Sequence, residues 1–173
     1  MDTNIEDIVN SYDLVLRYNK MDNSDMTGTR CDVYMPSFEV NDFKKNVTAK
    51  NLEIIKKSPK FVMCGNLVPE FKKSIEDVFA DTDFHDKVSY YNTFELQKYF
   101  SINIRTEKFM RFQSMCKYIL YAIWKYADEC TIDTVGFDID RKYFYGHPWH
   151  CFGLDEYRVL AKLYMQNKFN ILQ

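Results

Sequence analysis

The stretch RKYFYGHPWHCFG, residues 141–153, combines histidine, cysteine and tryptophan directly after FDID, which carries two aspartates two positions apart. On a strand, residues at that spacing share one face, and two carboxylates on one face can bind a hard cation such as Mg²⁺. Imidazole and thiolate groups favour the softer Zn²⁺. These residue types therefore predict a metal site with the candidate ligands Asp138, Asp140, His147, His150 and Cys151.

The mixture of ligand types leaves a structural interpretation of the same stretch open. Gly146 and Pro148 favour a turn, and Trp149 could fill the core beneath that turn. The histidines would then lie on its rim and bind no metal. We therefore expect no cofactor, with Zn²⁺ or Mg²⁺ as the alternative.

A Cys–His nucleophile pair is a third interpretation of the stretch. Cys151 would need a partner that lowers the pKa of its thiol. His85, which lies between Asp83 and Asp86 in TDFHDK, could provide it. Free cysteines are more commonly small buried hydrophobic residues, so we name no catalytic residue.

Protein binding is the function that the aromatic part of the stretch favours. Aromatic residues in an exposed turn are typical of protein interfaces. The candidate binding residues there are Tyr143, Tyr145, His147 and Trp149. The chain has five glycines and no G-x-x-x-x-G-K-[ST], G-x-G-x-x-G or G-x-S-x-G motif. A glycine loop that cradles a nucleotide is therefore not expected.

The segment 41–73 is basic, with eight lysines against Asp42, Glu53 and Glu70. It is either a solvated face balanced by the acidic N-terminal block or a docking surface for an acidic partner or for phosphates. The candidate docking residues are Lys44, Lys45, Lys56 and Lys57. The segment has no arginine, the residue favoured for bidentate phosphate contacts, and the net charge is −2. Nucleic acid is therefore not an expected partner.

The compartment is indicated by what the sequence lacks. The N-terminus, MDTNIEDIVN, has no apolar segment of the secretory kind, and no run approaches the roughly 18 apolar residues of a membrane span. The five cysteines are scattered without a C-x-x-C pair, which is typical of free thiols in a reducing compartment. We expect an intracellular, cytoplasmic protein with no membrane partner.

The elements that must position these residues are read from hydrophobic spacing. The chain is 46% hydrophobic, which suffices for a single domain over residues 1–173. Spacing of i, i+3, i+4 and i+7 predicts a long central amphipathic helix at about 106–129 and another helix at 4–19. NLVPEFKKSIEDVFAD and TFELQKYF predict shorter helices, whereas CDVYMPSFEV, KFVMC and TIDTVGFDID predict short strands. The expected fold is α+β, mainly α, with a few antiparallel strands.

The expected function is that of a non-enzymatic protein-binding or regulatory protein. Residues with GC-rich codons, such as glycine and proline, are scarce, which is typical of an AT-rich genome such as that of a virus or phage. Host factors would then be its partners. The alternative is a small metal-dependent phosphodiesterase or nuclease, in which Asp138 and Asp140 bind the metal and His147 or His150 is the general base.

The metal alternatives predict a measurable dependence on metal. If His147, His150 and Cys151 are ligands, purified protein carries near-stoichiometric Zn²⁺ and its melting temperature falls when EDTA is added. A rise in melting temperature with Mg²⁺ or Mn²⁺ alone would indicate Asp138 and Asp140 instead. Elemental analysis combined with thermal melting measures both effects, and protein that neither holds metal nor responds to it would contradict both alternatives.

Overall fold

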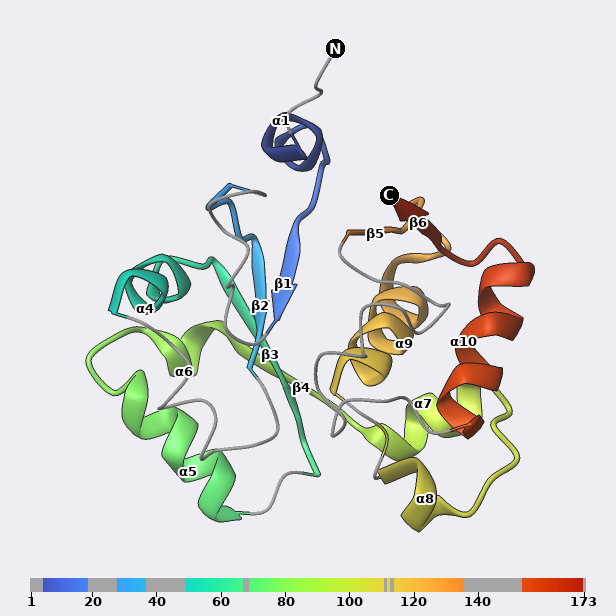
Figure 1. The fold of residues 1–173 in the computed structure, drawn as a ribbon. Helices are drawn as coiled ribbons and strands as arrows, with labels where there is room; N and C mark the ends of the chain where they lie inside the picture. Colours follow the sequence, from blue (N-terminus) through green and yellow to red (C-terminus); the bar gives the residue numbers. More distant parts are fainter. Residues whose placement is uncertain are drawn as a thin grey trace. The chain divides into compact units, whose positions relative to one another are not determined.

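The computed structural model describes residues 5–18, 28–36, 49–66, 69–110, 112, 114–135 and 154–172. These residues group into two compact units, one within residues 1–92 and one within residues 93–173 (Figure 1). The single-domain organisation over residues 1–173 stays a prediction. In the part of the chain that is described, no helix combines the length and the apolar character of a membrane span.

The first unit is built on sheet A, four parallel strands in the order β1-β2-β3-β4. The strands are β1 (Leu16–Tyr18), β2 (Val33–Met35), β3 (Lys60–Cys64) and β4 (Val88–Tyr91). The registers place Tyr34 beside Phe61 and Cys64 beside Tyr91. Because successive strands are parallel, the chain must cross back over the sheet between each strand and the next.

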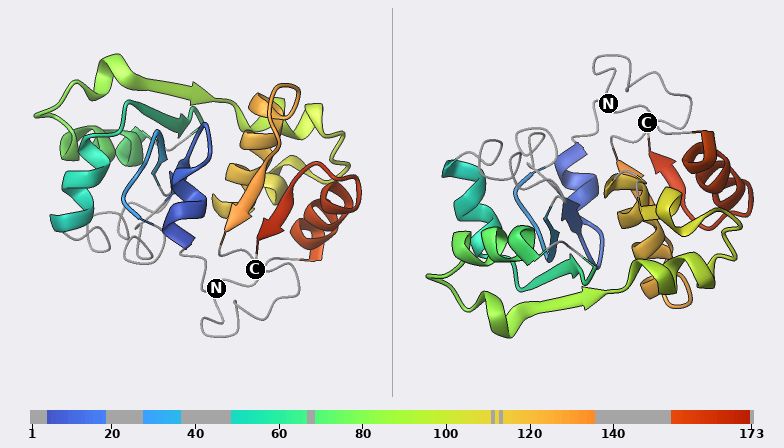
Figure 2. Two further views of the ribbon diagram at one scale, coloured as in Figure 1. Left: turned by 90° about the horizontal axis from the view of Figure 1, so that it is seen from above. Right: turned by 90° about the horizontal axis from the view of Figure 1, so that it is seen from below.

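The described helices that follow β2 in the first unit lie in these crossovers. In chain order, α4 (Ala49–Lys56) lies between β2 and β3, and α5 (Pro69–Val78) and α6 (Phe84–Lys87) lie between β3 and β4. Crossovers of this kind are right-handed. Because each strand in the order β1-β2-β3-β4 is placed on the same side of the one before, right-handed crossovers place their helices on the same face of sheet A. Figure 2 shows α4 and α5 side by side on one side of sheet A. The helix predicted in NLVPEFKKSIEDVFAD is confirmed as α5.

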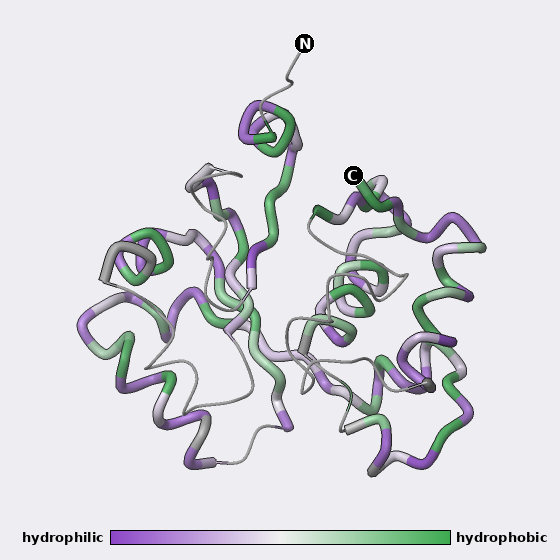
Figure 3. The backbone as a smooth tube through the Cα atoms, viewed as in Figure 1, coloured by the Kyte–Doolittle hydropathy of each residue, from purple (hydrophilic) through white to green (hydrophobic). Residues whose placement is uncertain are grey.

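The core of the first unit lies between sheet A and these helices. The Phe61 ring on β3 is fully buried, 5.0 Å from the Phe79 ring and 4.9 Å from the Phe84 ring between centroids. Hydrophobic residues alternate with hydrophilic ones along α5 (Figure 3), as expected for a helix with one buried face. The buried members of the cluster are Cys31, Tyr34, Ile55, Phe61, Met63, Ile75, Phe79 and Phe84.

Among its described residues, the second unit contains four helices and a pair of strands. The helices are α7 (Thr93–Tyr99), α8 (Thr106–Met110), α9 (Ser114–Tyr126) and α10 (Leu154–Met165), and the strands are β5 (Asp133–Val135) and β6 (Asn170–Leu172). α7 packs against α8 and α9. β5 and β6 are parallel, and the Asn170 side-chain amide donates to the Asp133 carboxylate at 2.7 Å. The short helix predicted in TFELQKYF is confirmed as α7.

The prediction of an α+β, mainly α fold with antiparallel strands is wrong. Every strand pair among the described residues is parallel, so the fold is mixed α/β. The physical reason is the helix that follows a strand: it covers the sheet and returns the chain to the edge where that strand began. The next strand then runs in the same direction as the last.

The long central helix predicted at about 106–129 is also wrong, because α8 ends at Met110 and α9 begins at Ser114. Between them the Phe112 N–H donates to the Phe109 oxygen at 3.0 Å, which forms a turn. The two rings are buried, with centroids 4.9 Å apart. Residues three apart come together in such a turn as they do in a helix, so hydrophobic spacing alone does not distinguish the two.

The helix predicted over 4–19 is wrong beyond its first turns. α1 (Ile5–Asn10) ends early, and the chain then extends into β1. The Arg30 guanidinium donates, at 2.6–3.0 Å, to the main-chain oxygens of Asn10, Tyr12 and Asp13. Carbonyl groups at a helix end need hydrogen-bond donors. Arg30, from a distant part of the chain, supplies the donors that the N–H groups of a further helical turn would have supplied.

Asp32 fixes the start of β1 against β2. Its carboxylate pairs with the Arg30 guanidinium at 2.9 Å and accepts the Val15 N–H at 2.8 Å. The Val15 oxygen in turn accepts the main-chain N–H groups of Asp32 and Val33, at 3.0 and 3.1 Å. The entry into the sheet therefore depends on two charged side chains as well as on apolar burial.

Truncation of Phe61 should destabilise the first unit strongly. We expect Phe61→Ala to lower the free energy of unfolding by about 3–5 kcal/mol, because it removes the ring that Phe79 and Phe84 pack against. Urea denaturation measures the change. Tyr99→Ala is the control, since Tyr99 is 52% exposed and should change stability by less than about 0.5 kcal/mol. If Phe61→Ala lowered the free energy of unfolding by less than about 1 kcal/mol, Phe61 would not be the central side chain of this core.

Candidate functional site

Most of the predicted site residues lie outside the described part of the chain. They are Asp138, Asp140, Tyr143, Tyr145, His147, Trp149, His150, Cys151, Lys44 and Lys45. The metal site and the aromatic binding loop therefore stay predictions. Among the residues that the structure does describe, no group of three or more histidine, cysteine, aspartate or glutamate side chains could hold a metal ion.

The structure does describe two of the predicted docking lysines. The Lys56 ammonium lies 2.7 Å from the Asp81 carboxylate, and this hydrogen bond lowers the pKa of the Asp81 carboxyl group. Lys57 is exposed directly after α4. The role of both lysines in docking stays a prediction.

Three of the described cysteines are buried, and Cys130 is exposed. Burial raises the pKa of the Cys31 thiol to about 11 and that of the Cys116 thiol well above its usual value. Both therefore remain thiols at neutral pH and act as small hydrophobic residues. His85 is exposed on α6, with its ring centroid 5.8 Å from that of Phe84, and its pairing with Cys151 lies outside the described residues.

The carboxyl edge of sheet A is where ligand chemistry is expected in this kind of fold. Ligands of open parallel sheets bind outside the carboxyl ends of the strands, which here are Tyr18, Met35, Cys64 and Tyr91. The strand order does not reverse along sheet A, so there is no switch point to make a crevice. The residues that follow the strands must therefore define any site.

Gly65 leaves the backbone open at this edge. It is exposed directly after β3, and its N–H donates to the Tyr91 oxygen at 2.7 Å, which continues the strand pairing by one residue. A Cβ atom at position 65 would lie 3.3 Å from that oxygen and 3.6 Å from the Tyr90 Cβ atom. A side chain would crowd the Tyr91 oxygen and touch Tyr90 at an ordinary contact distance, so glycine leaves the main chain uncovered beside Tyr90.

Lys72 places a positive charge next to the same residues. Its Nζ atom lies 4.7 Å from the centroid of the Tyr90 ring, a cation–π geometry, and 44% of Tyr90 is exposed. The Glu76 carboxylate is 3.8 Å from the ammonium, which is too far for a hydrogen bond. The ammonium is therefore ion-paired with Glu76 without a hydrogen bond to it, and it remains half-exposed beside the Tyr90 ring.

The N-terminus of α5 adds to the positive potential of this edge. Residues 65–68 join β3 to α5, so the helix begins at the carboxyl edge, as Figure 1 shows. Helix N-termini carry partial positive charge from unpaired N–H groups, and Pro69 at the first position is typical of them. Glu70 in the first turn offsets part of this charge.

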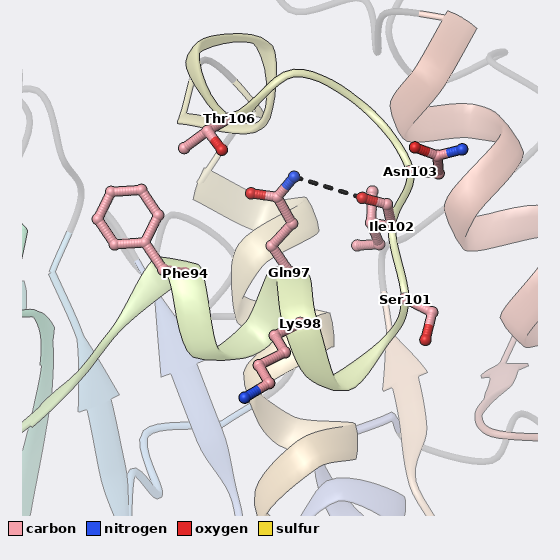
Figure 4. Close-up of a pocket in the computed structure, with 7 residues that line it drawn as sticks. All are labelled: Phe94, Gln97, Lys98, Ser101, Ile102, Asn103 and Thr106. Atoms are coloured by element: carbon pink, nitrogen blue, oxygen red, sulfur yellow. Dashed lines mark hydrogen bonds between the residues drawn. The ribbon is translucent and has the colours of Figure 1, made fainter.

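A pocket of about 420 Å³ lies in the second unit, between α7 and the segment that leads to α8 (Figure 4). Gln97 on α7 closes one wall: its side-chain nitrogen donates to the Ile102 and Ile104 oxygens at 3.3 and 2.8 Å. Phe94 and Thr106 line the same pocket. This arrangement belongs wholly to residues 94–106 and forms a shallow, open hollow with a mainly apolar lining and a few polar groups beside an aromatic ring.

The rim of this pocket contains a residue in the left-handed region, Ser101, with φ of 48°. The Ile102 N–H bonds to the Gln97 oxygen at 3.0 Å and the Ser101 N–H to the Lys98 oxygen at 3.1 Å. These two bonds are the Schellman arrangement that ends a helix with a left-handed residue, most often glycine. Asn167 has the same role after α10, with φ of 53°.

Glycine at position 101 should stabilise the protein. We expect Ser101→Gly to raise the free energy of unfolding by about 0.5–1 kcal/mol, since it relieves the left-handed conformation of a residue with a Cβ atom. Asn167→Gly is the matched control with a smaller gain, because asparagine tolerates this region better than serine. Thermal denaturation compares the two variants, and a destabilised Ser101→Gly protein would show that the serine side chain is needed there.

Sequence reasoning missed Gly65, Lys72 and Tyr90 as a group. The available signal was a short apolar strand, KFVMC, followed at once by Gly-Asn and then by a helix that begins with proline. That order indicates a strand–loop–helix unit whose loop lies at a carboxyl edge. No known protein family, no curated protein and no solved structure matches the chain, so the function has to be argued from this geometry.

Proposed function

We propose that the first unit binds a small phosphate-bearing ligand at the carboxyl edge of sheet A. The observation that carries the proposal is the Lys72 ammonium, held over the exposed Tyr90 ring beside the open backbone at Gly65. A lysine ammonium is a compact charge that suits phosphate oxygens. The segment 41–73, which contains Gly65 and Lys72, is also the basic part of the sequence.

The three groups support different parts of such a ligand. The Lys72 ammonium would donate to the phosphate oxygens, and the N-terminus of α5 would add favourable potential at the same edge. Gly65 lets a ligand approach the main chain without meeting a side chain. The exposed face of Tyr90 offers apolar contact for the remainder of the molecule. Neither a glycine-rich loop nor a bidentate arginine is needed for this mode of binding.

Acidic residues nearby limit the strength of the attraction. α5 carries Glu70, Glu76 and Asp77 as well as Lys72 and Lys73, so the helix as a whole is not basic. Binding would then depend on the position of Lys72 over Tyr90 rather than on total charge. A specific site depends on the position of one lysine, whereas a generally charged surface depends only on the number of charges. Variants that remove one lysine each from different positions test which of the two applies.

The test uses Lys72→Gln, with inorganic pyrophosphate as the probe and isothermal titration as the measurement. We expect this variant to bind about fivefold to tenfold more weakly than the unaltered protein, because it loses a charge-assisted contact. Lys73→Gln is the matched control: it removes an equal charge from the next position on α5, and its affinity should change by less than about twofold. Glu70→Gln should strengthen binding, since it removes a competing negative charge from the helix N-terminus.

The outcome depends on the comparison between the two lysines. Equal weakening by Lys72→Gln and Lys73→Gln would reduce the effect to general electrostatics, and no heat of binding in the unaltered protein at low salt would refute the proposal. The protein-binding function predicted from Tyr143, Tyr145, His147 and Trp149 stays a separate prediction, because those residues lie outside the described part of the chain.

A further inference from the structure

We propose that the pocket between α7 and α8 in the second unit binds a planar heteroaromatic ring with an N–H donor on its edge, the chemistry of a nucleobase. The proposal rests on residues 94–106 alone and is independent of the phosphate site in the first unit. The volume of about 420 Å³ lies within the range of roughly 300–1,000 Å³ found for small-molecule sites.

The direction of the Gln97 amide is fixed by its hydrogen bonds. Two main-chain oxygens, those of Ile102 and Ile104, lie at 3.3 and 2.8 Å from one end of that amide. Both are acceptors, so the end they meet must be the NH₂ group and the other end must be the oxygen. The amide cannot turn over without placing its oxygen against two carbonyl oxygens and losing both bonds.

The fixed Gln97 oxygen points into the pocket. Figure 4 shows the Gln97 side-chain oxygen directed towards Phe94 and Thr106, away from Ile102. Among the described residues no hydrogen bond to this oxygen is found, and Gln97 itself is only half-buried. The pocket therefore presents an acceptor that is held in place before any ligand arrives, which reduces the entropy lost on binding.

An aromatic ring and a hydroxyl group line the pocket beside this acceptor. The Phe94 side chain is 45% exposed and supplies the face of an aromatic ring, which can stack on a flat ligand. Thr106 supplies a hydroxyl group that both donates and accepts. A planar ring can stack on Phe94 while its N–H group donates to the Gln97 oxygen and its adjacent carbonyl group accepts from the Thr106 hydroxyl group. Such a ligand uses all three side chains.

The backbone around the pocket is held by the same residues. The Schellman bonds at Ser101 and Ile102 set the end of α7, and the Gln97 side chain fastens the chain up to Ile104. The Gln97 side chain thus supplies the acceptor and, through its NH₂ group, also holds the main chain at Ile102 and Ile104 in place. Such a wall is preorganised rather than assembled by the ligand.

The experiment uses the full chain, isotope-labelled for NMR, and two probes that share the same ring but differ in whether its nitrogens carry hydrogen or methyl groups. Uracil carries ring N–H donors, whereas in 1,3-dimethyluracil methyl groups replace both. We expect uracil to shift the Gln97 side-chain NH₂ signals and the Thr106 amide signal. Binding of 1,3-dimethyluracil should be at least about tenfold weaker, because it leaves the Gln97 oxygen without a donor.

Two variants separate the pocket from the surface around it. Phe94→Ala should abolish the uracil-dependent shifts while the spectrum elsewhere stays that of the folded protein, because Phe94 is 45% exposed and lies outside the buried core. Tyr99→Ala is the matched control: Tyr99 is 52% exposed on the same helix but does not line the pocket, and the shifts should persist. Equal affinity for the two probes, unchanged Gln97 signals, or shifts that survive Phe94→Ala would each overturn the proposal.

Discussion

The first unit depends on the burial of the Phe61 ring in the middle of sheet A. Phe61 lies on β3, next to Tyr34 on β2, and it meets Phe79 after α5 and Phe84 on α6. One side chain therefore connects a neighbouring strand with the crossover helices. An aromatic ring of this size dominates the hydrophobic contribution of its surroundings. Parallel strands require crossover segments, and the helices in those segments cover the Phe61 ring. The burial of Phe61 therefore stabilises the parallel arrangement.

The candidate ligand site follows from the same arrangement. A crossover helix must begin where the preceding strand ends, so α5 starts at the carboxyl edge next to Gly65. The pairing of β3 with β4 brings Tyr90 to that edge, and the helix brings Lys72 over its ring. None of these residues is chemically distinctive alone. Their proximity is produced by parallel strand pairing, and an antiparallel sheet would not place a helix N-terminus there.

Polar contacts of single side chains decide the local course of the chain in both units. Arg30 replaces the helical hydrogen bonds that would have extended α1, and this frees the chain to enter the sheet. Gln97 does the same work after α7, where its NH₂ group holds two carbonyl oxygens and directs its own oxygen into a pocket. In each case a side chain, rather than secondary structure, satisfies main-chain carbonyl groups beyond the end of a helix.

The sequence by itself determined those elements whose signals are local: the strand KFVMC, the proline-started helix α5 and the short helix α7. It did not determine the direction of strand pairing. β1 lies within the segment predicted as a helix over 4–19, and the crossovers can be identified only when all four strands of sheet A are known. Nor did it distinguish one long helix from α8 and α9, because hydrophobic spacing survives the turn at Phe112. Only the tertiary structure decided which polar residues meet, as Arg30 with Asn10 or Lys72 with Tyr90, because such contacts depend on residues that lie far apart in the chain.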